Sequence, residues 1–255
     1  MIILVILAVL LAAVFAAAVT ADKNVKVQNQ MLDELFRGLR AEYPVTQEDA
    51  GSFSTIRIRR IMNFRVRRYR MEGVGNIAVM QVNAGLMQMS TVMLTPFLKD
   101  VPLVSFDNIY MLRRRKAYIE FIDPEQEERG QENMYRKQLL LLETEFADLK
   151  PVSLSHSWQD PLNVFLLLRQ ADASADPRLA EMQDAAVRKL LSICDDAPAL
   201  DAAGTEEKVR STERYYRNLI SRGGAATDVF KSTLGEEQTE KFFDEVFFGT
   251  AAYRG

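Results

Sequence analysis

Six short segments between residues 55 and 122 most constrain what this chain can fold into. Each alternates apolar with polar residues or is rich in β-branched residues, and glycine, proline or charged residues separate one from the next. The pattern predicts strands at residues 55–60, 64–71, 77–83, 86–94, 103–112 and 117–122. Because the connections are short, consecutive strands are expected to pair as an antiparallel meander.

The periodicity changes to 3.6 residues beyond Asp123, which is typical of amphipathic helices. We expect helices at residues 132–149, 161–169, 178–195, 206–221 and 238–248, and one before the strands at residues 29–42. Helices that flank a run of strands predict an α+β protein in which they cover a central antiparallel sheet. A chain of 255 residues, 48% of them hydrophobic, is long enough for one sizeable domain with its own core.

The N-terminus is apolar without interruption from Ile2 to Val19, just long enough to cross a bilayer as a helix. The small residues at 19–21 would suit a signal peptidase, but no lysine or arginine precedes the run, which favours an uncleaved anchor. We therefore expect a transmembrane helix at residues 1–21 and a single domain at residues 22–255.

The charges that follow this run predict the orientation of the domain. Lys23 and Lys26 come directly after it, so the positive-inside rule predicts a single-pass membrane protein with its C-terminal domain in the cytoplasm. The single cysteine, Cys194, agrees with that compartment because one cysteine cannot form an internal disulfide.

Asp107 is the one residue that is charged at neutral pH in the apolar run from Pro102 to Leu112. Side chains alternate across a strand, so Asp107 shares a face with Leu103, Ser105 and Ile109 and is expected to project among apolar neighbours. Desolvation would raise its pKa and make it a proton donor near neutral pH. The alternative is a structural carboxylate that accepts a hydrogen bond from a nearby backbone N–H.

Composition and motifs exclude several classes of chemistry. One histidine, His156, and one cysteine cannot build a His/Cys zinc site. The sequence contains no HExxH, GxGxxG, GxxxxGK[ST] or GxSxG pattern, so we expect no bound metal, dinucleotide or nucleotide cofactor and no serine hydrolase site.

Positive charge is concentrated in the first two predicted strands. Seven arginines follow one another with no acidic residue among them before Glu72. They are Arg57, Arg59, Arg60, Arg65, Arg67, Arg68 and Arg70. The alternation at residues 64–67 predicts one basic and one apolar sheet face. The basic face either is simply solvated or binds anions. The candidate anions are anionic lipid, an acidic protein and a ligand with carboxylates. Nucleic acid is not expected, because the net charge is -3 and no binding motif accompanies the arginines.

Three motifs resemble the ferredoxin-dependent bilin reductases. The sequence Pro102–Asp107 (PLVSFD) resembles that family's Pro-Leu-Phe-Gly-Cys/Ala-Asp strand, and Trp158 with residues 164–169 resembles its tryptophan before a hydrophobic helix that ends in arginine. Residues 227–248 resemble its closing segment, in which Gly-Glu precedes an aromatic-rich last helix. Order and spacing agree over roughly residues 31–248, so the chain looks like a divergent member, with red chlorophyll catabolite reductase as a related branch.

The resemblance implies an α/β/α sandwich with a central antiparallel sheet flanked by helices. It also implies an enzyme with no bound cofactor that reduces a linear tetrapyrrole such as biliverdin with single electrons from ferredoxin or flavodoxin. In that family a strand aspartate donates the proton, and the matching residue here is Asp107. The basic strands would help to attract an acidic ferredoxin.

The sequence also departs from the family pattern. By counting back from Asp107, the family's histidine falls on Ser90 and its paired glutamate near Gln81, so these two are the expected substrate-binding positions, with Arg113 and Arg115 as candidates for holding the propionates. Two functions therefore stay open. One is a membrane-anchored bilin reductase with Asp107 as the general acid. The other is a non-catalytic tetrapyrrole-binding or protein-interaction module on the same fold.

Overall fold

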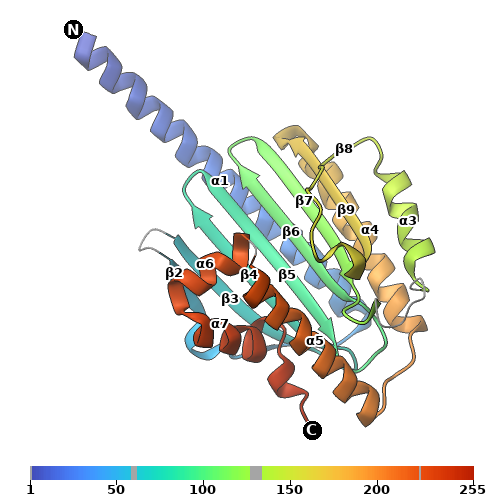
Figure 1. Cartoon of the computed structure of the whole chain (residues 1–255). Coiled ribbons are helices and arrows are strands. Elements are labelled where there is room, and N and C mark those ends of the chain that lie inside the picture. The colour runs from blue at the N-terminus through green and yellow to red at the C-terminus, as the bar shows by residue number, and fades with distance from the viewer. Residues whose placement is uncertain (1, 59–61, 127–133, 224) are drawn as a thin grey trace.

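A nine-stranded antiparallel sheet forms the centre of the molecule (Figure 1). The computed structural model describes the backbone of residues 2–58, 62–126, 134–223 and 225–255, and side chains from residue 15 onward except residues 225 and 226. The strand order is β1-β3-β4-β5-β6-β7-β9-β8, with β2 paired to β3. The bounds are β1 Val45–Glu48, β2 Thr55–Ile58, β3 Met62–Met71, β4 Gly75–Ala84, β5 Met87–Pro96, β6 Leu103–Met111, β7 Arg114–Ile122, β8 Lys150–Pro151 and β9 Asn163–Asp172.

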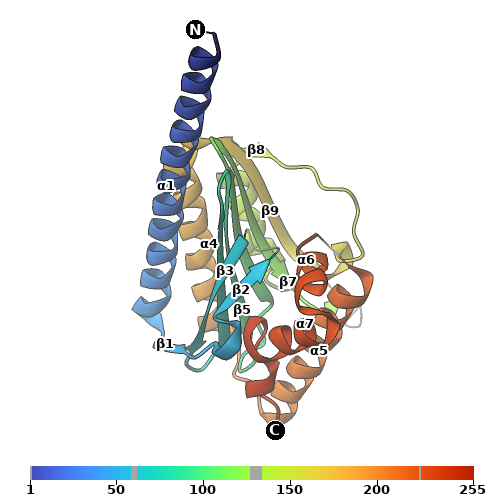
Figure 2. The same cartoon turned by 90° about the vertical axis from the view of Figure 1, so that its left-hand side faces the viewer.

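Helices cover both faces of the sheet, so the expected α+β sandwich with an antiparallel sheet is confirmed (Figures 1 and 2). One apolar core joins the sheet to α1 Ile2–Glu42, α3 Arg136–Glu145 and α4 Asp176–Asp196. A second core joins the other face to α5 Ala202–Arg222, α6 Ala225–Leu234 and α7 Glu236–Phe242. Each strand can face two cores because successive side chains point to opposite sides.

The two faces are covered to different extents. The C-terminal helices pack on β2 to β5 and on the ends of β6 and β7 that carry Leu103 and Ile122. Figure 2 shows these helices against the end of the sheet that is remote from the N-terminus. The middle of β6, β7 and β9 is therefore only half covered on that side, and Asp107, Tyr118 and Leu166 are partly exposed there.

The predicted helix at residues 161–169 is wrong, because this segment forms the start of β9. Val164, Phe165, Leu167 and Leu168 are all buried, which produces a continuous apolar run. Such a run does not distinguish a strand buried on both faces from a buried helix. Trp158, which was expected to precede a helix at residues 164–169, thus precedes strand β9 in the structure.

Helix α1 extends the predicted helix at residues 29–42 back to Ile2, so it passes without a break through the expected domain boundary at residue 21. Figure 2 shows its N-terminal half projecting beyond the sheet. Most of the apolar run, residues 1–14, has side chains outside the described residues. Among the helices in the described part of the chain, none combines the length and apolar character that crossing a membrane requires.

Buried amides fix α1 against the sheet and α4. Asn24 donates to the Gln88 side chain at 2.8 Å, and Gln28 donates to the Asn108 carbonyl at 2.9 Å. Asn108 in turn donates to Gln183 of α4, which donates to the Met31 carbonyl of α1. Because unpaired buried amides are costly, this chain of bonds allows one axial position and rotation of the helix.

Candidate functional site

Cross-strand pairing places Asp107 in the centre of the half-covered face. Its row of neighbours runs across five strands as Met80, Thr91, Asp107, Tyr118 and Leu168. These residues share one face because directly paired residues in an antiparallel sheet point to the same side. The direct neighbours of Asp107 in this row are thus Thr91 and Tyr118, which carry hydroxyl groups, and apolar side chains follow further out at Met80 and Leu168.

Two hydroxyl groups hold the Asp107 carboxylate. Thr91 donates to Oδ1, and Ser105 donates to Oδ2 at 2.6 Å. Burial nevertheless raises the pKa of Asp107, and the two hydroxyl donors oppose that shift only in part. A carboxyl with a raised pKa can hold a proton near neutral pH, which is the property that a general acid requires.

Glu120 is a second carboxyl on the same face, and the sequence analysis missed it. It lies on β7, directly opposite Ser105, the residue that donates to Asp107. Burial, and secondarily the charge of Asp107, raises the pKa of Glu120 to about 7. The signal that singled out Asp107, an acidic residue within an apolar strand, is also present at residues 117–122 and would have found it.

Two tyrosines accompany the carboxyl pair. Burial raises the pKa of Tyr118, and Asp107 and Glu120 add to the shift. Burial also raises the pKa of Tyr215 on α5, with Glu120 as the next cause. The Tyr215 hydroxyl accepts a hydrogen bond from Gln159 at 2.9 Å. Both phenols thus stay protonated at neutral pH and can donate hydrogen bonds to a ligand.

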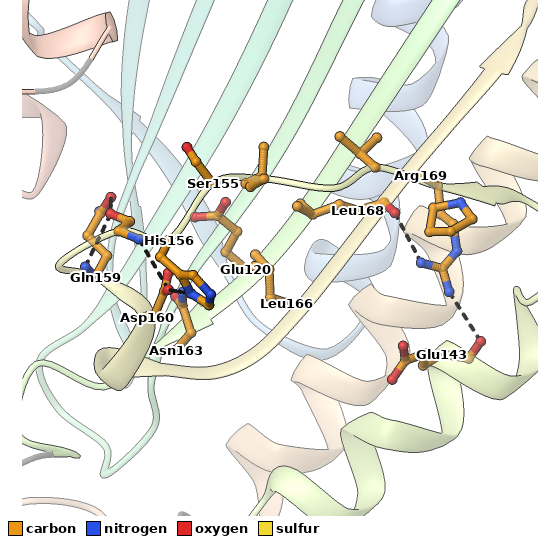
Figure 3. Close-up of a pocket in the computed structure, with 14 residues that line it drawn as sticks. Glu120, Glu143, Ser155, His156, Gln159, Asp160, Asn163, Leu166, Leu168 and Arg169 are labelled. Atoms are coloured by element: carbon orange, nitrogen blue, oxygen red, sulfur yellow. Dashed lines mark hydrogen bonds and ion pairs between the residues drawn. The ribbon is translucent and has the colours of Figure 1, made fainter.

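A cavity of about 380 Å³ lies beside this cluster, between the sheet and the loop that connects β8 to β9 (Figure 3). Glu120, Leu166 and Leu168 form its floor, and the loop residues His156 and Gln159 lie at its rim. Asp107 is not among the lining residues and lies one strand further along the sheet. His156 is exposed and contacts Asp160 at 3.1 Å, as expected of a loop side chain. The cavity therefore reaches the carboxyl pair through Glu120.

The structure does not bring Ser90 and Gln81 to Asp107. These two are paired with each other, and Gln81 donates to Asn29 of α1, so both lie on the face opposite Asp107. The residue that pairs with Asp107 on β5 is Thr91. Counting back along the sequence thus missed by one residue, and one residue changes the face of a strand.

Arg113 and Arg115 are also remote from the carboxyl pair. Arg113 lies exposed in the turn between β6 and β7. Arg115 is buried on the α1 and α4 side, where its guanidinium binds Asp176 at 2.7 and 3.1 Å and lies 4.1 Å from the Tyr110 ring centroid. Arg115 is therefore a structural ion pair and not a group that is free to bind propionate.

The arginines of β2 and β3 do not form a single basic face. Arg65 and Arg67 lie on the α1 side of β3, while Arg68 lies on the other side and pairs with Glu48 at 3.3 Å. Glu48 also pairs with Arg70. Arg59 and Arg60 lie outside the described residues. Arg67 and Arg68 place positive charge on both faces of the sheet, because adjacent residues in a strand point to opposite sides.

The cluster contains oxygen and aromatic groups suited to proton transfer and to packing against a flat conjugated ligand. Within the residues that the structure describes, no group of three or more His, Cys, Asp or Glu side chains is placed to hold a metal ion.

Glu120 should make the stability of the fold depend on pH. Because its pKa rises from 4.5 to about 7 on folding, the folded state keeps a proton that the unfolded state releases in this window. We expect the free energy of unfolding to fall as the pH rises through that window, by up to about 1.4 kcal/mol per pH unit. Glu120→Gln should reduce the fall in denaturant titrations from pH 4 to 9, leaving the contribution of Asp107, whose pKa is also raised by burial. Glu143→Gln, at an exposed position, is the control and should keep the wild-type slope.

Comparison with known proteins identifies the fold. No family model matches the sequence, and no curated protein matches it. The structure is similar to that of phytochromobilin synthase from tomato, solved in complex with biliverdin, with a TM-score of 0.71. The similarity covers 89% of this chain and 84% of that chain at 11% sequence identity. The fold expected from the bilin reductase resemblance is thus confirmed.

Proposed function

We propose that this chain, built on the bilin reductase fold, reduces a linear tetrapyrrole with Asp107 as the proton donor. One observation carries the proposal. Asp107 and Glu120, two carboxyls whose pKa values burial raises, lie together on the half-covered face of the sheet beside a cavity. Carboxyls whose pKa values are raised by burial and that lie beside a cavity are candidates for acid catalysis, because they can hold a proton near neutral pH.

The reaction needs two electrons and two protons for each double bond reduced. Ferredoxin or flavodoxin supplies the electrons one at a time, and the ligand radical formed by the first is neutralised by a proton from Asp107. Glu120, which lines the cavity, supplies the second proton or returns one to Asp107 through Ser105. Solvent then reprotonates both carboxyls, so the groups of the protein are unchanged after each turnover. Exposed arginines such as Arg57 and Arg65 favour an acidic electron donor.

The choice of a linear tetrapyrrole rests on the fold neighbour, which was solved with biliverdin. The site suits such a ligand chemically, because apolar Leu166 and Leu168 can pack against its rings while Tyr118 and Gln159 can form hydrogen bonds. We further propose that residues 1–21 anchor the domain in a membrane with the domain on the cytoplasmic side. The uninterrupted apolar run and the lysines that follow it support this.

Binding of biliverdin should place the ligand against Leu166. Addition of the protein at micromolar concentration should shift and intensify the long-wavelength absorbance of biliverdin. Leu166→Glu should weaken this binding at least about tenfold, because it puts a charge into the apolar floor and repels the propionates. Leu141→Glu is the matched control, since Leu141 is 60% exposed on α3, and it should bind as the wild type does.

The alternative function, a non-catalytic module on this fold, makes different predictions. A tetrapyrrole-binding module would show the absorbance change but no reduction when ferredoxin and its reductase are supplied. A protein-interaction module would show neither. No absorbance change in the wild type at micromolar protein would therefore remove both tetrapyrrole functions.

A further inference from the structure

Two turns at the end of the sheet from which α1 projects carry large exposed apolar side chains. Leu86 lies in the turn between β4 and β5, Met111 is the last residue of β6, and Leu112 lies in the turn between β6 and β7. They are 53%, 51% and 41% exposed. The turns touch, because the Leu112 N–H donates to the Leu86 carbonyl at 3.1 Å. The three side chains thus form one apolar cluster on two linked turns, which we call the tip.

Turn chemistry does not explain the leucine at position 112. Its φ is 53°, in the left-handed region, where glycine or asparagine is favoured and a leucine costs about 1 kcal/mol or more. Among the described residues it is the one residue other than glycine with a positive φ. Burial of the Leu112 side chain in the core does not offset this free energy, because the side chain is exposed. Position 112 thus combines an unfavourable backbone conformation with an exposed apolar side chain, and exposed apolar patches of this kind mark candidate interaction sites.

The tip and α1 are held together as one rigid unit. The Leu112 carbonyl accepts hydrogen bonds from Asn24 of α1 at 2.9 Å and from Arg115 at 2.8 Å. Gln88, which binds Asn24, also donates to the Gly85 carbonyl of the other turn. Val19 precedes Asn24 by five residues, so at 1.5 Å per residue it lies only about 8 Å further along the helix axis. The tip thus lies within about one headgroup layer of the apolar run.

Positive charge surrounds the tip. Arg113, Arg114 and Lys116 are exposed in and beside the β6–β7 turn, and Lys23 is exposed on α1 one position before Asn24. The acidic groups at this end are engaged within the domain. Asp176 binds Arg115, Asp22 binds Lys26 at 2.8 Å, and Asp172 accepts from Ser174. Arg114 is paired in register with Asp172, so the cations here are exposed and only partly balanced. Exposed cations beside exposed apolar side chains fit a surface that is apolar inside and negatively charged at its face.

We propose that the tip is a membrane-contact surface: Leu86, Met111 and Leu112 enter the interface of a bilayer whose anionic headgroups bind Arg113, Arg114 and Lys116. The apolar face of α1 continues the same surface, because Phe15 is 71% and Val19 39% exposed just beyond the tip. Interfacial leucines with flanking cations bind anionic bilayers through combined burial and charge. The proposal rests on the membrane anchoring proposed above and adds that the domain is docked on the bilayer, in one orientation, rather than tethered freely.

The test uses the full chain with vesicles of phosphatidylcholine alone or mixed with phosphatidylserine. Leu112→Trp places a fluorophore in the tip, and lipids brominated in their acyl chains quench a tryptophan that enters the bilayer. We expect strong quenching of Leu112→Trp in the mixed vesicles. The native Trp158 and a Leu141→Trp control, at an exposed position on α3, should not be quenched. In the triple variant Arg113→Gln, Arg114→Gln, Lys116→Gln, quenching of Leu112→Trp should fall to its value in phosphatidylcholine alone.

Each contrary outcome removes a defined part of the proposal. If the chain floats with the vesicles but Leu112→Trp is not quenched, the tip does not contact lipid and only the anchor stands. Quenching that is equal in both vesicle types and in the triple variant would remove the headgroup contacts. A chain that does not float with either vesicle overturns both anchor and tip, whereas the absorbance titration with biliverdin still tests the tetrapyrrole site by itself.

Discussion

Asp107→Asn should lower the turnover of tetrapyrrole reduction by about 10²- to 10⁴-fold, the usual contribution of a positioned general acid. Asparagine has nearly the shape of a protonated aspartic acid, and its side chain can still bond to Thr91 and Ser105. The amide has no acidic proton to transfer to the ligand. Tetrapyrrole binding should therefore stay within about twofold of wild type, so single-turnover reduction with ferredoxin, followed by absorbance, would separate chemistry from binding.

The stability of this variant provides an internal control. Because burial raises the pKa of Asp107, the ionised carboxylate costs the fold free energy above neutral pH, and the neutral amide removes that cost. Asp107→Asn should thus be at least as stable as wild type at pH 8. Turnover that survives unchanged, in a protein with normal unfolding, would exclude Asp107 as the proton donor and leave Glu120 as the candidate. The Glu72→Gln variant, at an exposed position in the turn between β3 and β4 and away from the cavity, should keep wild-type turnover.

Arg115→Ala should lower the free energy of unfolding by about 3 to 5 kcal/mol, as expected when one partner of a buried ion pair is removed. The Arg115 side chain is 3% exposed. Its loss leaves Asp176 without its cation, the Leu112 carbonyl with one donor fewer and the Tyr110 ring without its stacked guanidinium. Urea or thermal unfolding at pH 7 would measure the change.

Arg113→Ala, two positions away in an exposed turn, is the matched control and should change stability by no more than about 0.5 kcal/mol. The pair of variants also distinguishes a structural Arg115 from a ligand-binding one. If Arg115→Ala weakened biliverdin binding while unfolding stayed normal, the ion pair with Asp176 would not be its main role.

The sheet was predictable from the sequence because most strands have one buried and one more exposed face, so apolar and polar residues alternate along them. In β3, β6 and β7 the alternation of side chains revealed each strand nearly to its ends. The segment at residues 163–172 broke the rule, since Val164 to Leu168 meet both an apolar core and the floor of the cavity. Where both faces are apolar, period 2 disappears and the sequence predicts only burial.

The site was predictable at Asp107 and not around it. An ionisable group in an apolar strand is a local signal, and Asp107 and Glu120 both carry it. The partners of Asp107 depend instead on which residues of β4, β5 and β6 lie opposite each other. The turns between the strands set this pairing register in the folded structure. A shift of one residue therefore moved the expected partners to Ser90 and Gln81 on the opposite face, although Thr91 is the neighbour. Arg115 similarly looked like a free cation because Asp176 lies 61 residues away in sequence.

Helices cover the two faces of the sheet to different extents, so substitutions on the two faces have different consequences for stability. Side chains toward α1, α3 and α4 are packed in a continuous core, so most substitutions there are removed by loss of stability before they can change function. Side chains at the middle of β6, β7 and β9 on the other side have fewer neighbours to disturb and can vary at small cost. Substitutions in that half-covered region can thus change the chemistry of one surface, while the two apolar cores preserve the fold.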